Sequence, residues 1–166
     1  TADFAKALGL SADTVQGFSK DIRVSLGSDA EANKAAIAAM FKGIADAAAA
    51  TVLDAQYIRE GEAAADTLAR LATNLTIVNG SFDTLGKTLL ATSQAGGDVA
   101  SSLIDQMGGL QAFQSSMSAY YQAYYSDEER LAKTREQTAA AFSSLGIAMP
   151  DTLQAFRDLV TAQDIS

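Results

Sequence analysis

Alanine, repeated along the chain and densest between Ala35 and Ala50, is the feature that most limits what this sequence can fold into. Alanine has the highest helix propensity and buries little apolar area. It therefore favours helices that pack closely together rather than helices separated by a thick apolar core. The chain has 166 residues, with only 1 proline and 12 glycines. We therefore expect a mainly all-α fold of about eight helical segments separated by Gly and Asn breaks.

Capping signals predict where several of these helices begin. Ser28 with Glu31, and Ser126 with Glu129, have the spacing of a capping box, in which each side chain bonds the other residue's backbone N–H. The first of these helices is expected to run to about Leu53, since apolar residues recur there at helical spacing. Helices should therefore begin soon after residues 28 and 126.

Glycine and proline predict where helices stop. Gly9 and Gly146 suit the position just after a helix end, and Pro150 suits the first turn of a last helix. The pairs Asn79-Gly80 and Gly96-Gly97 are expected to interrupt helices in the middle of the chain. These signals divide the central sequence into several short segments.

Residues 20–26 show a different period. Polar and apolar residues alternate there, and Ile22 and Val24 are β-branched, which predicts one short β-strand. Its partner could be residues 74–78, which read equally well as the end of a helix, or a strand of another chain or of a missing segment. Ile22 and Val24 are therefore candidate interface residues. The provisional domains are 1–27, with short helices and the strand, and 28–166, a helical module, although the whole chain can be one domain.

A stripe of aromatic residues is the most conspicuous candidate site. Its members recur at helical spacing and have two interpretations, core packing with phenol oxygens at the surface, or a protein interface, in which tyrosine and methionine are enriched. The residues are Phe113, Met117, Tyr120, Tyr121, Tyr124 and Tyr125. The stripe is wider than one neighbouring helix can bury, which supports the interface interpretation.

Composition argues against catalysis. The chain has no histidine or cysteine, so a catalytic triad and the commonest metal ligands are missing. Glu60 and Glu62, with Asp54 and Asp66 nearby, are more simply solvated helix-surface carboxylates than an acid/base pair. A net charge of −8 disfavours nucleic acid and anionic membranes. We expect no enzyme activity, no cofactor, no metal and no small-molecule substrate, and no segment long enough to span a membrane.

Five stretches, taken together and in this order, resemble the tail-length tape-measure proteins of tailed bacteriophages and prophages. They are FSKDIRVSL (18–26), REGEAAADTLARLATNL (59–75), VNGSFDTLG (78–86), AYYQAYYSDEER (119–130) and GIAMPDTLQAFRDLV (146–160). With the flanking sequence, the resemblance covers most of the chain. The first residue, Thr1, and the lack of a helix stop at the other end predict an internal fragment of a longer polypeptide, although a processed or artificially truncated product would look the same.

The resemblance implies a structural role. Tape-measure proteins are long, largely helical chains that occupy the lumen of the growing tail tube and set its length. The implied location is therefore the virion tail lumen, after synthesis in the bacterial host cytoplasm. The implied partners are copies of the chain itself and proteins of the tail tube and tail tip. Glycines interrupt this segment too often for a long coiled coil, so we expect a folded module within the extended protein.

Three hypotheses remain, in descending order. The first is a structural module of a phage tail, acting through helix-mediated protein contacts. The second is a helical protein-binding module of a bacterial adaptor or effector, which would act as a compact monomer. The third is an enzyme, against which the missing histidine, cysteine and tryptophan weigh heavily.

Overall fold

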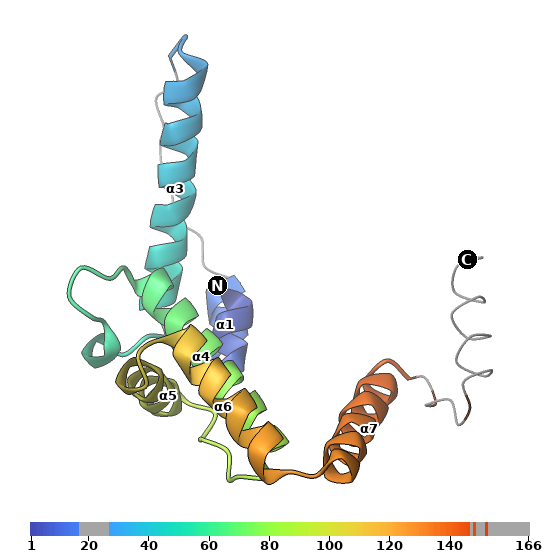
Figure 1. The fold of residues 1–166 in the computed structure, drawn as a ribbon. Helices are drawn as coiled ribbons and strands as arrows, with labels where there is room; N and C mark the ends of the chain where they lie inside the picture. Colours follow the sequence, from blue (N-terminus) through green and yellow to red (C-terminus); the bar gives the residue numbers. More distant parts are fainter. Residues whose placement is uncertain (17–26, 147, 149–151, 153–166) are drawn as a thin grey trace. The chain divides into compact units, whose positions relative to one another are not determined.

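A computed structural model describes residues 1–16, 27–146, 148 and 152 (Figure 1). Within these residues the chain forms seven α-helices and one 3-10 turn and no β-strand, so the all-α prediction is confirmed. The candidate strand at 20–26, with Ile22 and Val24, lies outside the described residues. The elements are α1 (Ala2–Ala7), α2 (Ala12–Gln16), α3 (Ala30–Ala50), η1 (Ala55–Tyr57), α4 (Ala64–Thr84), α5 (Gln94–Gln106), α6 (Leu110–Tyr124) and α7 (Asp127–Ser144).

The chain divides into two compact units, Thr1–Ser118 and Ala119–Ser166, and each is described here by itself. Helix α6 begins in the first unit and ends in the second. The domain boundary expected after residue 27 stays a prediction.

Helix α4 is the centre of the first unit. It packs against α5, α3 and α1, because apolar residues recur along it at helical spacing and turn one broad face inward. Leu68, Leu71 and Val78 on this face are fully buried, and Leu75 is nearly so. The other helices add mostly small side chains to this core, together with one large ring at Phe113, namely Ala5, Leu8, Val15, Ala48, Ala49, Ala100, Ile104 and Phe113.

The prediction that Gly96 and Gly97 interrupt a helix is wrong. Both lie in the first turns of α5, which begins after the N-cap Ser93, and both are buried. A Cβ atom on Gly97 would lie 2.8 Å from the carbonyl oxygen of Leu71. Gly97 therefore permits the close approach of α5 to α4, and a Cβ atom on Gly96 would overlap the carbonyl oxygen of Ala91, just before α5. Both are requirements of packing that a glycine pair in a sequence does not distinguish from a helix break.

The prediction that Asn79-Gly80 ends a helix is also wrong. Helix α4 continues through this pair to Thr84, because the buried Val78 and Leu85 keep the helix attached to the core on both sides. The amide of Asn79 accepts from the N–H of Leu90 at 2.8 Å and donates to its carbonyl at 3.0 Å. Asn79 thus holds the non-helical segment that follows α4 against that helix, at Leu90. Residues 74–78, the proposed internal strand partner, are helical.

The N-cap of helix α3 lies one residue after the predicted N-cap. Asp29, not Ser28, is the N-cap, and its carboxylate accepts from the N–H groups of Glu31 at 3.0 Å and Ala32 at 3.3 Å. The helix ends at Ala50, close to the predicted Leu53. Only Ala48 and Ala49 in α3 are buried. Residues 43–47 before them are half-buried, and the first half of the helix extends away from α1, α4 and α5 (Figure 1).

The other predicted helix ends are found where they fall on described residues. Gly9, after α1, and Gly146, after α7, have φ of 67° and 71°. Glycine adopts this left-handed conformation without strain, which confirms both stops. The helix expected to start at Pro150 lies outside the described residues.

Helix α7 is the main element of the second unit. Ser126 and Glu129 form the predicted capping box, with each side chain bonded to the other residue's N–H. No residue of α7 is buried against described parts of the chain. Its helical structure therefore rests on local capping more than on a packed apolar face.

Candidate protein interface

Tyr120 and Tyr124 form an exposed aromatic pair on α6. Their ring centroids lie 4.6 Å apart, at a tilt of 30°, as expected for side chains four residues apart on a helix. Tyr120 is 39% exposed and Tyr124 is 73% exposed. These two rings present apolar area with a polar hydroxyl at its edge, which is a composition common in protein contact surfaces.

Tyr121 and Tyr125 form a second pair that is half-buried. Their ring centroids lie 5.0 Å apart, and the Tyr121 hydroxyl donates to the carbonyl of Arg130 at 3.4 Å. The guanidinium of Arg130 in turn donates to the carbonyls of Gln122, at 3.0 Å, and Tyr125 at the end of α6, and pairs with Asp127. Arg130 therefore caps α6, and this tyrosine pair belongs to the corner between α6 and α7.

The aromatic stripe is thus divided by the structure. Phe113 is fully buried in the core of the first unit, and Met117 is half-buried against that core. In the second unit, Tyr121 and Tyr125 support the corner, and Tyr120 and Tyr124 face outward. The core-packing interpretation holds for Phe113. The interface stays a prediction, and the Tyr120–Tyr124 pair is the most exposed part of the stripe.

Other large apolar side chains are exposed on helices of each unit. In the first unit, Phe41 on α3 is 62% exposed and Ile37 is 37% exposed. In the second unit, Leu131 on α7 is 54% exposed, and Leu145 just after it is 74% exposed. Single exposed apolar residues are common, but these lie on helices with few buried residues of their own.

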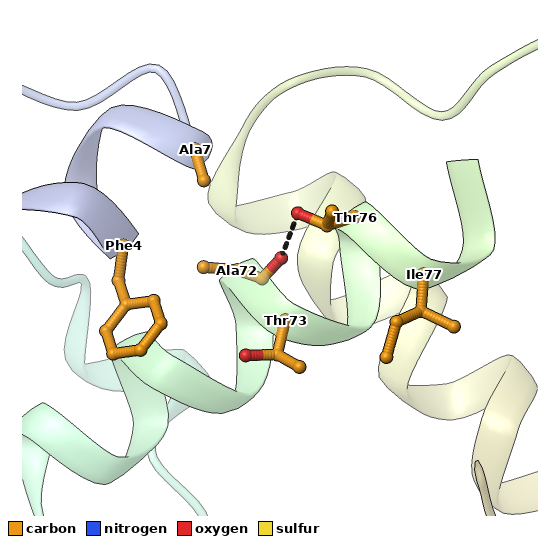
Figure 2. A pocket seen from close by; sticks show the side chains of 6 residues that line it. All are labelled: Phe4, Ala7, Ala72, Thr73, Thr76 and Ile77. Atoms are coloured by element: carbon orange, nitrogen blue, oxygen red, sulfur yellow. Dashed lines mark hydrogen bonds between the residues drawn. The ribbon is translucent and has the colours of Figure 1, made fainter. Parts of the chain in front are cut away.

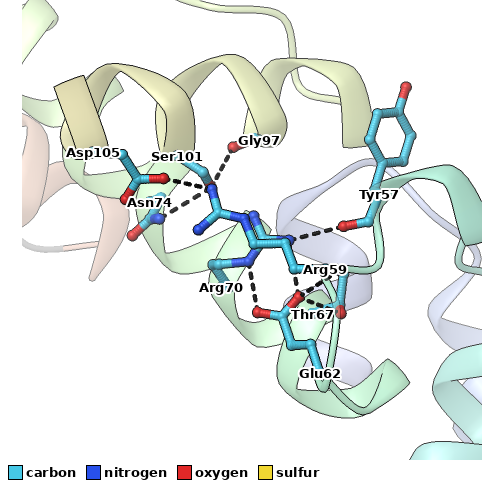
Figure 3. Close-up of polar contacts among 9 residues, drawn as sticks. All are labelled: Tyr57, Arg59, Glu62, Thr67, Arg70, Asn74, Gly97, Ser101 and Asp105. Atoms are coloured by element: carbon cyan, nitrogen blue, oxygen red, sulfur yellow. Dashed lines mark hydrogen bonds and ion pairs between the residues drawn. The ribbon is translucent and has the colours of Figure 1, made fainter.

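The most extensive polar cluster of the first unit joins the α3–α4 connection to α4 (Figure 3). The Glu62 carboxylate lies 2.8 Å from Nε of Arg70 and accepts from the hydroxyl of Thr67 at 2.6 Å. Arg70 also donates to the carbonyl of Tyr57 at 2.8 Å. The Arg70 guanidinium, aided by Thr67 and the N–H of Arg59, lowers the pKa of Glu62 to about 2. Glu62 is therefore ionised at neutral pH and suits a structural ion pair rather than a general acid.

Two of the carboxylates near Glu62 in the sequence, Asp54 and Asp66, have separate structural contacts. Asp54 caps the 3-10 turn by accepting from the N–H of Gln56 at 3.1 Å, and Asp66 pairs with Lys42 at 3.2 Å. Arg70, which organises the cluster, was not recognised from the sequence. It lies eight residues after Glu62 and beyond the start of α4, so no helical spacing connects the two.

An open apolar pocket of about 260 Å³ lies between α1 and α4 (Figure 2). The hydroxyl of Thr76 donates to the carbonyl of Ala72 within α4, so it is already engaged. The lining is mostly methyl groups and one aromatic ring, from Phe4, Ala7, Ala72, Thr73, Thr76 and Ile77. Such a lining gives no polar pattern by which to identify a ligand.

Among residues 1–16 and 27–146, no helix combines the length and hydropathy of a membrane span. In the same residues, no three His, Cys, Asp or Glu side chains are grouped so that they could hold a metal ion.

Comparison with protein-family models, with curated proteins and with solved structures finds no match to this chain.

Proposed function

We propose that this chain is a non-catalytic structural module of a phage or prophage tail tape-measure protein, acting in tail assembly and tail-length determination through helix-mediated protein contacts. Its partners would be copies of itself and proteins of the tail tube and tail tip. It would act in the lumen of the virion tail, after synthesis in the bacterial host cytoplasm. Direct specific binding of nucleic acid, membrane binding by this segment, and a small-molecule substrate are not part of the proposal.

The observation that carries the proposal is the exposed Tyr120–Tyr124 pair on a helix. The pair lies near the start of α7, which has no buried residue in the described structure. A helix of this kind gains stability when a partner covers it, since most helical stability in proteins comes from packing an apolar face. The order of the five resembling stretches supports the same assignment.

Replacing both exposed rings tests the contact surface. We expect the variant Tyr120→Ser/Tyr124→Ser to associate more weakly in light scattering and to keep its helical circular dichroism, because neither ring is buried. The matched control is Tyr121→Ser/Tyr125→Ser, which should lose helical signal at the α6–α7 corner. Unchanged association of the first variant would contradict a role for this pair in protein contacts.

Tail length in the parent phage tests the assignment itself. Deleting the coding segment for these 166 residues in frame should give shorter tails or block tail assembly. Electron micrographs of the particles provide the measurement. Tails of unchanged length would contradict the proposed function.

A second candidate is a helical protein-binding module of a bacterial adaptor or effector. The observation that favours it is the first unit, which has its own buried core around α4. Light scattering with small-angle X-ray scattering distinguishes the two. A compact monomer should have a radius of gyration of about 15 Å and would favour the binding module, whereas a defined oligomer or an elongated particle would favour the tail module.

A further inference from the structure

Helix α3 is divided by Gly43 into two unlike halves. From Ala30 to Lys42 no residue is buried, only Asn33, Ala36 and Met40 are half-buried, and Phe41 is 62% exposed. After Gly43, residues 44–47 are half-buried, and Ala48 and Ala49 are 5% and 0% exposed against the core. The second half is therefore held by packing, while the first half extends from it (Figure 1).

Neither packing nor backbone geometry requires glycine at position 43. Its φ is not in the left-handed region, and a Cβ atom placed there would meet no atom within 4 Å. Gly97, in contrast, is required by the close approach of Leu71. The remaining effect of Gly43 is on the backbone, since glycine in a helix interior is conformationally freer than any other residue.

One ion-pair group links the two sides of Gly43. Nζ of Lys42 lies 3.2 Å from Asp66 on α4 and 3.6 Å from Asp46 in the packed half of α3. Asp46 also accepts from the N–H of Ala65 at 3.2 Å and so caps α4, whose own N-cap, Ala63, has no side-chain acceptor. The packed half of α3 is thus hydrogen-bonded to the start of α4. The ion pairs of Lys42 connect the first half of α3, residues 30–42, to both of these segments.

The ion pair of Lys42 with Asp66 is exposed to solvent, and the pair with Asp46, whose side chain is 28% exposed, is partly exposed. The Lys42 side chain is 57% exposed and that of Asp66 is 63% exposed. Exposed pairs of this kind are weak and are screened by salt. Among the described residues, the side-chain contact that ties the first half of α3 to α4 is therefore easily broken, and the glycine beside it is where the helix bends most readily.

We propose that residues 30–42 form an arm that bends at Gly43, and that the ion pairs of Lys42 with Asp46 and Asp66 hold the arm straight at low ionic strength. The straight helix is one position of the arm, and raised salt populates bent positions. This device depends on contacts within the first unit and is independent of the proposed function.

Spin-label distance measurements on the full chain test the arm. The sequence has no cysteine, so each introduced cysteine carries one label. The pair Ala35→Cys/Val99→Cys reports the first half of α3 against α5, and Ala50→Cys/Val99→Cys reports the packed end of α3. We expect the first distance distribution to be broader than the second. It should broaden further between about 0.05 M and about 1 M salt, where the Debye length falls to about 3 Å.

Matched variants locate the bend and the contact that opposes it. Adding Gly43→Ala should narrow the Ala35–Val99 distribution, and Lys42→Gln should broaden it at low salt. Lys34→Gln removes the same charge two turns away in the first half of α3 and should leave it unchanged. An Ala35–Val99 distribution as narrow as the Ala50–Val99 one at both salt concentrations would overturn the proposal. A Gly43→Ala distribution as broad as the parent's would overturn it too.

Discussion

At the scale of single residues, Arg70 and Glu62 make the contact with the largest expected effect on stability. Their side chains are only 14% and 19% exposed. Arg70 also donates to the carbonyl of Tyr57 in the α3–α4 connection, and Glu62 also accepts from the hydroxyl of Thr67 in α4. Arg59 and Asp105 make a second pair at 2.6 Å, but these side chains are 43% and 55% exposed. The two pairs thus differ mainly in burial.

Removing the guanidinium from each pair should separate these cases. Arg70→Leu leaves a largely buried carboxylate without its cation, so we expect the free energy of unfolding to fall by about 3 kcal/mol. Arg59→Leu at the exposed pair is the matched control and should cost less than about 1 kcal/mol. Urea denaturation measures both values. Equal losses in the two variants would show that burial does not govern these pairs.

The low pKa of Glu62 makes the free energy of unfolding depend on pH between about 2 and 4.5. Its pKa is about 2 in the folded chain against an ordinary 4.5, so the folded state favours the ionised form. Stability from this group is fully present above pH 4.5 and is lost as the pH falls from 4.5 towards about 2. When urea denaturation is measured from neutral pH down to about 3, the free energy of unfolding should fall less steeply with pH in Glu62→Gln than in the parent. Identical slopes would contradict the ion pair.

At the scale of elements, the packing of α5 on α4 depends on glycine. Gly97 faces Leu71 so closely that any side chain forces the helices apart, whereas a Cβ on Gly80, within α4, would meet nothing within 4 Å. Two glycines that look alike in the sequence therefore have opposite roles. One is needed for contact between helices, and the other only lowers helix propensity.

The same substitution at the two glycines should have opposite signs. We expect Gly97→Ala to lower the free energy of unfolding by about 1–3 kcal/mol through overpacking. Gly80→Ala should raise it by about 0.5–1 kcal/mol, because alanine is the better helix former. Thermal and urea unfolding of the two variants provide the test. A neutral Gly97→Ala would mean that α4 and α5 are not in close contact.

At the scale of the whole molecule, the buried side chains are unevenly distributed. Within the described residues, every buried hydrophobic side chain lies at or before Phe113, in the first unit. The helix α7 of the second unit has none. Cooperative unfolding of this chain should therefore come from the first unit.

Fragments test this division. Residues 1–126, which keep α6 complete, should unfold cooperatively, with a melting temperature within about 5 °C of that of the full chain. Residues 119–166 alone should show weak helical circular dichroism, because an isolated helix without a packed face is marginal in water. Non-cooperative unfolding of residues 1–126 would contradict a self-sufficient core in the first unit.

Local chemistry in the sequence determined the fold class and many helix ends. Alanine content and apolar spacing predicted an all-α chain, and the Ser126–Glu129 capping box and the stops at Gly9 and Gly146 are confirmed. These features depend on backbone propensity and on hydrogen bonds within a few residues, which neighbouring sequence alone specifies. The resemblance to tape-measure proteins, and the interface expected at Ile22 and Val24, stay predictions.

Tertiary contacts decided the rest. Whether a glycine pair breaks a helix or admits a neighbour depended on Leu71, which lies 26 residues before Gly97 in the chain. Which tyrosines face outward depended on Arg130, and the ionised state of Glu62, just before α4, depended on Arg70 within α4. Each of these outcomes comes from groups that meet only after the chain has folded, and no local propensity encodes such a meeting.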